Sequence, residues 1–379
     1  MKNYLFVFGR DFELSLMEFD FYCKARNIKY QVIERKENIA VISIDYDIKK
    51  LVNELGGLVK VGEIIKIKDK NEITKYLESE ISKIGENKMR YGISVYFNSS
   101  LNEFVSDSIR NIFKEFKIKG ILLNERKGNE LNPSKIVKTS LIEEGFDLML
   151  FKNYLARTIA VSNPLEYKSR DKRPRNDFVK SISIRLAKIL INLSGAKEND
   201  ILLDPFCGVG VLLQEALLMN INVIGIDNDR KSIKDSYENI DWLKKNYKFK
   251  SNSKLLNNDA RKLRYILKDK VDVIVTEPYL GPYLKKLPTK EIALKIKKEL
   301  EALYNEVFYN FKYILKKDGR IVFIVPRFRL YENEKVNLNF NEILIKNDFK
   351  TVKSEFKIPI IYTARGNKFE REIWIVNNS

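Results

Sequence analysis

The fold is decided by one stretch of this 379-residue sequence, Leu202-Leu203-Asp204-Pro205-Phe206-Cys207-Gly208-Val209-Gly210-Val211-Leu212-Leu213. Its apolar residues predict a strand that ends near Asp204, and its two glycines predict a turn that opens a helix. Glycine lets the backbone approach a ligand closely, and the first turn of a helix offers N–H groups without an intrahelical partner. The stretch therefore predicts a ligand-binding turn, for which a plain strand–helix turn is the alternative.

Acidic residues follow this turn at the ends of three later predicted strands. Asp227 follows a strand over residues 223–226, Asp259 follows one over 254–256, and Glu277 follows one over 271–276. A carboxylate after the second strand can accept both hydroxyls of a ribose. A carboxylate after the third strand can receive the amine of an adenine. This series favours a ligand site over the plain turn.

The strands on either side of the turn alternate with helices. They are expected over residues 201–203, 223–226, 254–256, 271–276 and 320–325. Near-continuous apolar runs of this kind fit parallel strands that are covered on both faces. We predict a doubly wound, Rossmann-like α/β domain over residues 178–379, with a first helix over 178–193 and final strands over 351–358 and 371–376.

The residues before this domain are typical of α+β structure. Residues 1–68 follow the order β-α-β-β-α-β, which predicts a small ferredoxin-like unit. Residues 69–162 predict a second unit, with a helix over 133–144 and a hairpin of strands over 146–151 and 155–161. Residues 163–177 are polar, basic and interrupted by prolines, so we interpret them as the connection between the domains.

The charge of the chain predicts a polyanionic partner. Lysine and arginine number 69 against 51 acidic residues, a net charge of +18. Nucleic acid is the natural partner for such an excess, and the lysine bias of an AT-rich genome is the alternative explanation.

The rarest residues exclude several kinds of chemistry. The sequence has no histidine, which rules out a Ser-His-Asp triad and every His-ligated metal site, so we expect no metal. Its two cysteines, Cys23 and Cys207, cannot form a disulfide framework, which favours a reducing cytoplasm. No stretch approaches the roughly 18 apolar residues of a membrane helix, and we expect no membrane association.

The glycine turn resembles a known motif. A dinucleotide fingerprint would have a third glycine at position 213, where this chain has leucine. Residues 204–210, Asp-Pro-Phe-Cys-Gly-Val-Gly, resemble motif I of class I S-adenosylmethionine-dependent methyltransferases. The whole series is similar to their amino-methylating branch, in which the fourth strand is typically followed by Asp/Asn-Pro-Pro-Tyr.

Three further segments indicate which family of methyltransferases the chain resembles. Residues 169–177, Ser-Arg-Asp-Lys-Arg-Pro-Arg-Asn-Asp, resemble the Arg-Asp…Arg-Pro…Arg-Asp connector of tRNA guanosine N2-methyltransferases. Residues 55–62, Leu-Gly-Gly-Leu-Val-Lys-Val-Gly, are similar to a segment of their N-terminal region. Residues 131–137, Leu-Asn-Pro-Ser-Lys-Ile-Val, resemble a helix start in their THUMP domain, an RNA-binding module. The chain thus resembles the THUMP-domain tRNA guanine-N2-methyltransferases, namely the archaeal-type guanosine-10 enzymes and their eukaryotic counterparts.

This resemblance implies an enzyme that methylates an exocyclic amine in RNA, most simply N2 of a guanosine in tRNA. The implied cofactor is S-adenosylmethionine, and the partner is tRNA or another structured RNA. The residues implied to bind the cofactor are Asp204, Pro205, Phe206, Cys207, Gly208, Gly210, Asp227, Asn228, Asp259 and Ala260. Cys207 is interpreted as a small filler beside the cofactor, and Asp229 as a helix cap.

The expected catalytic residues are Glu277, Pro278 and Tyr279. The Glu277 carboxylate and the Pro278 carbonyl can accept the N–H bonds of the amine, and Tyr279 can stack on the base. A solvated strand-end acid and a packing tyrosine are the alternatives for Glu277 and Tyr279. The residues expected to contact RNA phosphates are Arg170, Lys172, Arg173 and Arg175 in the connection and Lys285 and Lys286 after the catalytic loop.

The chain also departs from the family pattern. Val209 replaces the usual threonine, and residues 277–282, Glu-Pro-Tyr-Leu-Gly-Pro, replace Asp-Pro-Pro-Tyr-Gly. Glutamate keeps the acid but adds a methylene, and one proline is lost. Two other functions therefore stay open: methylation of adenine N6 in DNA or of rRNA, and RNA binding by a catalytically inactive relative. We favour a monomer.

Overall fold

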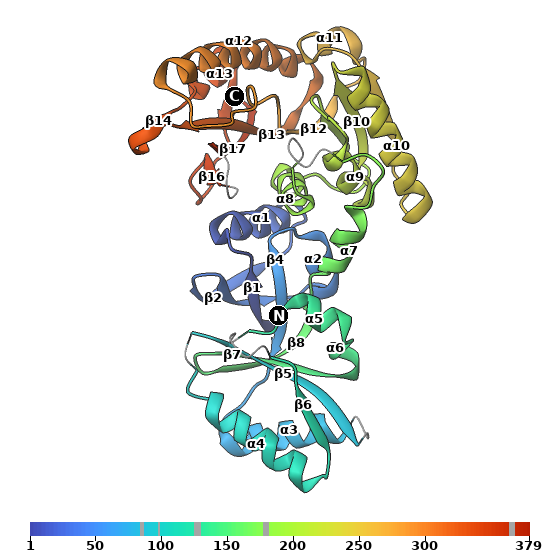
Figure 1. Ribbon diagram of the computed structural model, residues 1–379, viewed down its shortest axis with the longest axis vertical. Coiled ribbons are helices and arrows are strands. Elements are labelled where there is room, and N and C mark those ends of the chain that lie inside the picture. Colours follow the sequence, from blue (N-terminus) through green and yellow to red (C-terminus); the bar gives the residue numbers. More distant parts are fainter. Residues whose placement is uncertain (84–86, 98, 125–129, 177–181, 364–367) are drawn as a thin grey trace. The chain divides into compact units, whose positions relative to one another are not determined.

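The computed structural model describes residues 1–83, 87–97, 99–124, 130–176, 182–363 and 368–379, which form two compact units (Figure 1). The first unit contains Met1–Phe12 and Ile28–Arg170, and the second contains Glu13–Asn27 and Asp171–Ser379. Helix α1 (Phe12–Ala25) thus groups with the C-terminal unit, although the sequence pattern places it in an N-terminal domain.

The first 64 residues have the predicted element order. Helix α1 lies between β1 and β2 along the chain, and α2 lies between β3 and β4. The strands pair antiparallel in the order β2-β3-β1-β4. The bounds are β1 (Lys2–Phe8), β2 (Tyr30–Lys36), β3 (Ile39–Ile44), α2 (Ile48–Glu54) and β4 (Leu58–Ile64).

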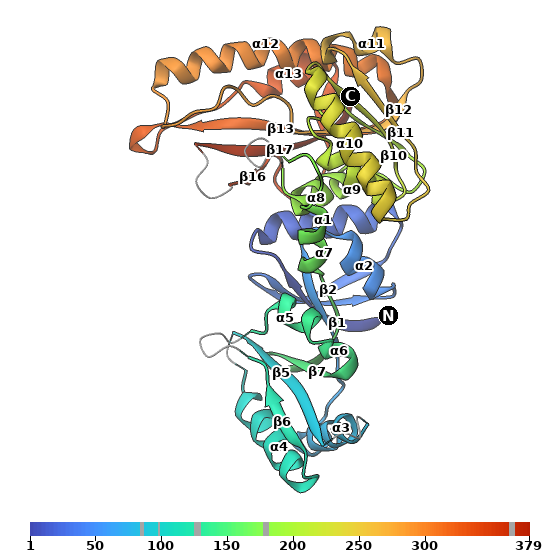
Figure 2. The same cartoon turned by 45° about the vertical axis from the view of Figure 1, so that its right-hand side comes forward.

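The following strands extend the same sheet, which runs β2-β3-β1-β4-β8-β7-β5-β6. Helices α3 and α4 share one apolar cluster with β5, β7 and β8, and they lie next to each other in both views (Figures 1 and 2). The elements are α3 (Lys70–Ser82), β5 (Lys88–Tyr96), α4 (Asn102–Glu115), β6 (Lys119–Leu122), β7 (Gly145–Phe151), β8 (Tyr154–Val161) and α7 (Pro164–Arg170).

A buried ion pair joins the two halves of this sheet. Lys60 on β4 donates to Asp147 on β7 at 2.9 Å and to Ser94 on β5 at 2.8 Å. Both charged side chains are almost completely buried. A buried charge is tolerated only when it is paired and hydrogen-bonded, so this network specifies how the halves fit together. Residues 1–68 and 69–162, expected as separate domains, therefore share one sheet.

The expected single helix over residues 133–144 is wrong. The chain forms two short helices, α5 (Pro133–Lys138) and α6 (Leu141–Glu144), because Ser140 between them adopts a left-handed conformation with φ +47°. Thr139 and Ser140 can compete with the helix for backbone hydrogen bonds, which favours a break here. Asn132 caps the first of these helices, since its side chain accepts from the Ser134 N–H, and the expected hairpin of β7 and β8 is confirmed.

The second unit contains the predicted parallel sheet. Its strands follow the order β11-β10-β9-β12-β13-β17-β15, in which β11, β10, β9, β12 and β13 are parallel and β17 is antiparallel. The order reverses between β9 and β12. The strands are β9 (Ile201–Asp204), β10 (Asn222–Asp227), β11 (Ser253–Asn257), β12 (Val271–Thr276), β13 (Leu315–Arg329), β15 (Phe349–Thr351) and β17 (Phe369–Asn378).

Two expected elements of this unit differ in extent. The strand expected over residues 351–358 is wrong: β15 ends at Thr351, and the short β16 (Ile360–Tyr362) pairs separately with β17. Val352 still donates to the Ile375 carbonyl at 3.0 Å, and Pro359, just before β16, has no N–H to offer to a strand ladder. The helix expected over 178–193 is α8 (Ile184–Ser194), capped by Ser183 and ended by Gly195 at φ +75°. Residues 178–181 of that expectation lie outside the described residues.

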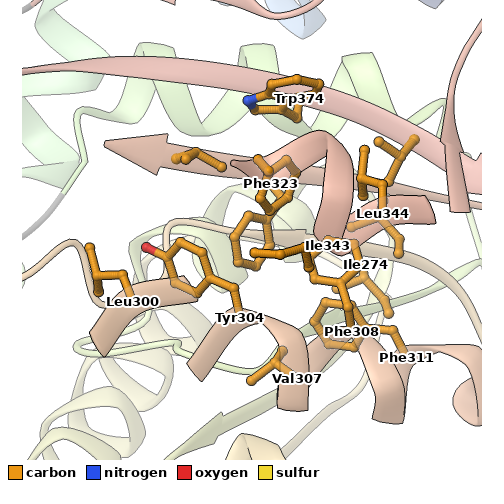
Figure 3. Packing of buried hydrophobic residues seen from close by; sticks show 14 of the residues in the cluster. Ile274, Leu300, Tyr304, Val307, Phe308, Phe311, Phe323, Ile343, Leu344 and Trp374 are labelled. Atoms are coloured by element: carbon orange, nitrogen blue, oxygen red, sulfur yellow. The ribbon is translucent and has the colours of Figure 1, made fainter. Parts of the chain in front are cut away.

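Helices cover both faces of this second sheet. In both views α12 (Lys290–Ile314) and α13 (Phe340–Lys346) lie on one face, and α8 lies on the other with α1 (Figures 1 and 2). Figure 3 shows the aromatic core beneath α12, where the Phe308 ring lies 5.1 Å from the rings of Phe311 and Phe323. Such edge-to-face pairs add to the stability that burial provides. No helix among the described residues is long and apolar enough to cross a membrane.

Polar contacts attach α1 to the second unit. The amide of Asn192 on α8 donates to the buried Glu18 carboxylate at 2.7 Å, and Arg26 donates to the carbonyl of Ala196. The Arg320 guanidinium lies 5.1 Å from the centre of the Phe21 ring. A C-terminal fragment that begins at residue 171 therefore lacks one helix of its own unit.

We expect Asn192→Ala to lower the free energy of unfolding by about 1–3 kcal/mol, because it removes a donor from a buried carboxylate. Urea unfolding measures the change. The matched control is Asn246→Ala, since Asn246 also donates through its amide but is exposed. The control should change stability by less than about 0.5 kcal/mol. Equal losses in the two variants would contradict the assignment of α1 to this unit.

Candidate active site

A cavity of about 250 Å³ lies at the carboxyl ends of β9 and β12. This is the point where the strand order reverses, and ligands bind at such points in open α/β sheets. The glycine turn contributes Phe206, Cys207 and Gly208 to the cavity wall, and the strand ends contribute Asp204 and Glu277. Residues at the start of α10 (Arg230–Asn246) also line the cavity: Asp229, Lys231, Ser232 and Asp235.

The two glycines of the turn serve different purposes. Gly208 has φ +51°, and a Cβ added there would meet no atom within 4 Å, so the space beside it is open to a ligand. Gly210 has φ +79° and begins α9 (Val211–Leu218), where an added Cβ would lie 2.4 Å from Ser236 Oγ. Gly210 is therefore required by packing, and Gly208 leaves room for a bound molecule.

Asp227 supports the turn from the end of β10. Its Oδ2 accepts from the Gly208 N–H and its Oδ1 from the Asp229 N–H, both at 2.9 Å. Burial raises the pKa of Asp227, while these two hydrogen bonds oppose the change. Each carboxylate oxygen can accept a second hydrogen bond, so the residue is able to bind hydroxyls beside the turn. Asp229 caps α10, as predicted, by accepting from the Lys231 N–H.

Asp204 is the most strongly perturbed acid of the site. Its buried Oδ1 accepts from the Thr276 hydroxyl at 2.6 Å and from the Phe206 N–H at 3.1 Å. Burial raises the pKa of Asp204 to about 7, although both hydrogen bonds lower it. The nearby charges of Asp227 and Glu277 raise it further. The residue thus connects β9 to the end of β12.

Six of the expected cofactor residues do not line the cavity: Pro205, Gly210, Asp227, Asn228, Asp259 and Ala260. Asp259 forms a two-point ion pair with Arg261, at 3.0 and 2.6 Å, which lowers the pKa of the Asp259 carboxyl. Ala260 is buried and Asn228 is exposed. The ion pair with Arg261 holds Asp259 at the end of β11 but uses both oxygens of the Asp259 carboxylate. Contact of Asp259 with an adenine therefore stays a prediction.

The turn's remaining expected residues are buried. Pro205 lies beneath the turn, and Cys207 carries a free thiol in the cavity wall. Burial raises the pKa of this thiol well above its ordinary value. A thiolate nucleophile is therefore disfavoured, which agrees with the interpretation of Cys207 as a filler.

The catalytic loop presents a carboxylate and a tyrosine. The Glu277 Oε1 accepts from the Nε of Arg371 on β17 at 2.5 Å, and both side chains are nearly buried. Burial raises the pKa of Glu277, and Arg371 opposes this shift. Pro278 is buried, whereas the Tyr279 side chain is 52% exposed and free to contact a planar ligand. The Tyr279 carbonyl accepts from the buried Tyr304 hydroxyl at 2.8 Å, which anchors the loop.

Sequence reasoning missed Arg371 and Tyr304. Arg371 is one of several charged residues on a C-terminal strand, and Tyr304 is an apolar-face residue of a long helix. Neither carries a motif, and each is 25 or more residues away from the loop that it contacts. Only the paired strands and the packed helix bring them to the site.

The basic residues of the connection have internal partners. Arg170 is buried at the end of α7 and pairs with Glu166 at 2.5 Å. Arg173 is also buried, near Asp171, and Arg175 pairs with Glu238 at 2.6 Å. Exposed lysines remain for a polyanion at three of the expected positions, Lys172, Lys285 and Lys286. Asp177 and Lys180 lie outside the described residues. Phosphate contact by the basic residues of the connection and of the catalytic loop stays a prediction.

The sheet order, the antiparallel β17, the glycine turn after β9 and the acids after β9, β10 and β12 together define a class I methyltransferase domain. Within the described ranges, no group of three or more Cys, Asp or Glu side chains is placed to hold a metal. The chemistry of this class depends on an organic cofactor instead of a metal ion.

Comparison with known proteins agrees with this class. Residues 170–342 match the family of RMKL-like methyltransferase domains, and residues 30–238 match a DNA methylase family. Over its full length the chain resembles the crystal structure of TrmN from Thermus thermophilus, at a TM-score of 0.53 and 13% identity, with 100% of both chains covered. At that identity the likeness concerns the fold.

Curated relatives give the family. The chain is 34% identical over 166 residues to a tRNA (guanine(10)-N2)-dimethyltransferase of Methanothermobacter thermautotrophicus, covering 43% of this chain and 45% of that protein. It is 34% identical over 156 residues to a probable enzyme of the same name from Methanothermococcus thermolithotrophicus, covering 41% of this chain and 83% of that protein. The Methanocaldococcus jannaschii enzyme is 31% identical over 195 residues, covering 48% and 50%.

The chain belongs to the family of the tRNA (guanine(10)-N2)-dimethyltransferases. Its match spans about half the length of the first and third of these relatives. The resemblance stated from the sequence is thereby confirmed, and S-adenosylmethionine, the cofactor expected from the sequence, is the cofactor of this family of methyltransferases.

We expect Asp204→Asn to make the protein less sensitive to pH. The folded pKa of about 7 lies above the unfolded value of about 3.9, so Asp204 destabilises the folded state progressively as pH rises between these values. Asparagine keeps an acceptor for Thr276 and cannot ionise. The free energy of unfolding in urea should therefore differ between the two proteins in a pH-dependent way. The variant's value minus the wild-type value should be larger at pH 8 than at pH 4.

Asp229→Asn is the control with the opposite sign. Its cap hydrogen bonds lower the pKa of Asp229, so the wild-type carboxylate contributes stability that is present at neutral pH and lost in acid. The control should lose stability relative to the wild type at pH 8. A parallel pH response of Asp204→Asn and the wild type would contradict the raised pKa of Asp204.

Proposed function

We propose that the protein transfers methyl groups from S-adenosylmethionine to N2 of a guanosine in tRNA. One observation carries the proposal: the glycine turn after β9 and the Glu277 carboxylate after β12 line the same cavity. A cofactor held by the first would therefore lie beside an amine held by the second. The names of the relatives support guanine N2 in tRNA as the target.

The residues of the cavity fit the cofactor. The open space at Gly208 leaves room for a ligand against the backbone, and Asp227 can accept the hydroxyls of a ribose beside it. Asp204 and the first turn of α9 lie at the same end of the sheet, where a positively charged group would be stabilised by the acids. When bound, the cofactor supplies an electrophilic methyl group on a sulfonium.

The loop residues act on the guanine. Its exocyclic amine is a poor nucleophile because its lone pair is delocalised into the ring, so the amine must be held in line with the methyl group. We assign the proton released from N2 to the Glu277 carboxylate, while the Pro278 carbonyl accepts a hydrogen bond from the amine and helps to orient it. The exposed ring of Tyr279 stacks on the base, and the Tyr304 hydroxyl holds the loop in place.

The first unit binds the RNA in this proposal. The order β2-β3-β1-β4 with α1 and α2 supports a ferredoxin-like arrangement, and the α3–β8 part supports a THUMP-like module. The net charge of +18 favours a polyanion. A cytoplasmic location accords with a tRNA substrate and with two free, buried cysteines, Cys23 and Cys207.

We expect Asp227→Ala to weaken binding of S-adenosylmethionine at least about tenfold, because charge-assisted hydrogen bonds are worth about 1.5–3 kcal/mol each. Titration calorimetry measures the affinity without any turnover. Asp272→Ala is the control: its carboxylate also accepts a backbone N–H, from Ile201, but it lies at the opposite end of β12. The control should keep cofactor affinity. Unchanged affinity in folded Asp227→Ala would contradict the assignment.

Mass spectrometry of nucleosides tests the activity itself. Unmodified tRNA treated with the protein and S-adenosylmethionine should gain N2-methylguanosine or its dimethyl form. Glu277→Gln should reduce turnover by about 10²–10⁴, the range for a positioned proton acceptor, while tRNA and cofactor affinities stay within a few-fold. Methylation of adenosine instead would favour the adenine-N6 alternative, which the DNA methylase match also suggests. Cofactor binding without any methylation would favour an inactive RNA-binding protein.

A further inference from the structure

We infer that Arg371 is the positioning residue for the Glu277 carboxylate, and that these two residues form one functional pair. The inference rests on the proposed function, because it concerns the acceptor of the amine proton. The Arg371 Nε lies 2.5 Å from the Glu277 Oε1. Both side chains are largely removed from solvent, with exposed fractions of 13% and 11%. The pair therefore differs from an ordinary surface ion pair, which is exposed to water and does little to hold its two side chains in one position.

The strand order explains why glutamate stands at position 277. Glu277 follows β12 and Arg371 lies on β17, and β13 lies between these two strands in the sheet. Neighbouring strands are about 4.8 Å apart, so the two backbones are separated by about two strand spacings. The extra methylene of glutamate lengthens the reach toward Arg371. We therefore attribute the glutamate at position 277, where the family has aspartate, to the presence of the arginine on β17.

The pair also controls the protonation of the acid. Burial raises the pKa of Glu277, whereas the Arg371 charge and hydrogen bond lower it. Among the described residues, the other ionisable groups that interact with Glu277 are Asp204 on β9 and Tyr304 on α12, and neither is a cation at neutral pH. Within this part of the chain, Arg371 thus supplies the charge that favours the ionised carboxylate. A proton acceptor has to be ionised before it can act.

The same sheet provides a matched control. Arg327 on β13 donates to Glu370 on β17 at 2.6 Å, and the exposed fractions of 20% and 11% are similar. Glu370 precedes Arg371 in sequence, but neither Arg327 nor Glu370 lines the cavity. Removing Arg327 therefore disrupts an ion pair of the same sheet without touching the site, and Lys335 still donates to Glu370 at 3.1 Å.

The test compares Arg371→Met, Arg371→Lys and Arg327→Met in the full-length protein. Arg371→Met should lower kcat at least about tenfold, with KM for tRNA and calorimetric affinity for S-adenosylmethionine within a few-fold. The acid limb of its pH–rate profile should move to higher pH, because the pKa of Glu277 rises. Arg371→Lys should recover part of the rate, since it keeps the charge. Arg327→Met should keep the wild-type kcat and acid limb.

A double-mutant cycle distinguishes positioning from general damage. In the Glu277→Gln background, Arg371→Met should cause no further loss of kcat. Glu277→Asp should slow the wild type, despite restoring the family's residue, but should not slow Arg371→Met further. A wild-type rate and pH profile in Arg371→Met, or rate losses that simply multiply, would overturn the inference. Should Arg371→Met fail to fold, the same cycle is run with Arg371→Lys, whose smaller loss of kcat should likewise vanish in the Glu277→Gln background.

Failure of the proposed function gives a different result. A wild-type protein that methylates no tRNA would refute that function but not the pairing of the two residues. The same four proteins, wild type, Glu277→Gln, Arg371→Met and the double variant, are then compared by urea unfolding. Strongly non-additive losses of stability support the pair, and additive losses overturn it.

Discussion

The site depends on one hydrogen bond between neighbouring parallel strands. The Thr276 hydroxyl at the end of β12 donates to the buried Asp204 carboxylate at the end of β9, at 2.6 Å. These are the strands between which the sheet order reverses. Because the glycine turn follows β9 and the catalytic loop follows β12, this bond keeps the two ligand-binding segments at one cavity. In the proposed function, strand pairing thus sets the position of the cofactor relative to the reacting amine.

The cavity concentrates negative charge in a nearly buried place. Asp204, Asp227 and Glu277 each have a pKa raised first of all by burial, and the charges of Asp227 and Glu277 add to the shift at Asp204. Such an arrangement costs stability in the absence of a cation. Arg371 offsets one of the three charges, and the single positive charge of a sulfonium would offset one more. Acids with raised pKa values that gather in a cavity are typical of functional sites.

The two compact units do not follow the chain order. Helix α1 lies between β1 and β2 in sequence, yet its buried Glu18 accepts from Asn192 on α8 and its Phe21 contacts Arg320 on β13. Cutting the chain after residue 170 would remove this helix from the methyltransferase unit. One helix from the N-terminal part of the chain thus packs with the C-terminal unit. This is why composition and linker cues alone misplace the boundary of that unit.

Local sequence pattern predicted the motif and most of the elements, although it was wrong for the helix over 133–144 and the strand over 351–358. Near-continuous apolar runs that alternate with helical segments predicted the parallel sheet, and two glycines predicted the turn at Gly208 with acids at the strand ends. These features depend on local pattern. Tertiary structure alone decided which distant side chains meet: Arg371 with Glu277, Tyr304 with Tyr279, and Asn192 with Glu18. It also buried Arg170 and Arg173, which the sequence analysis expected to contact RNA phosphates. Periodicity shows which face of a strand or helix is buried, but the partner on that face depends on how the strands are ordered and how the helices pack.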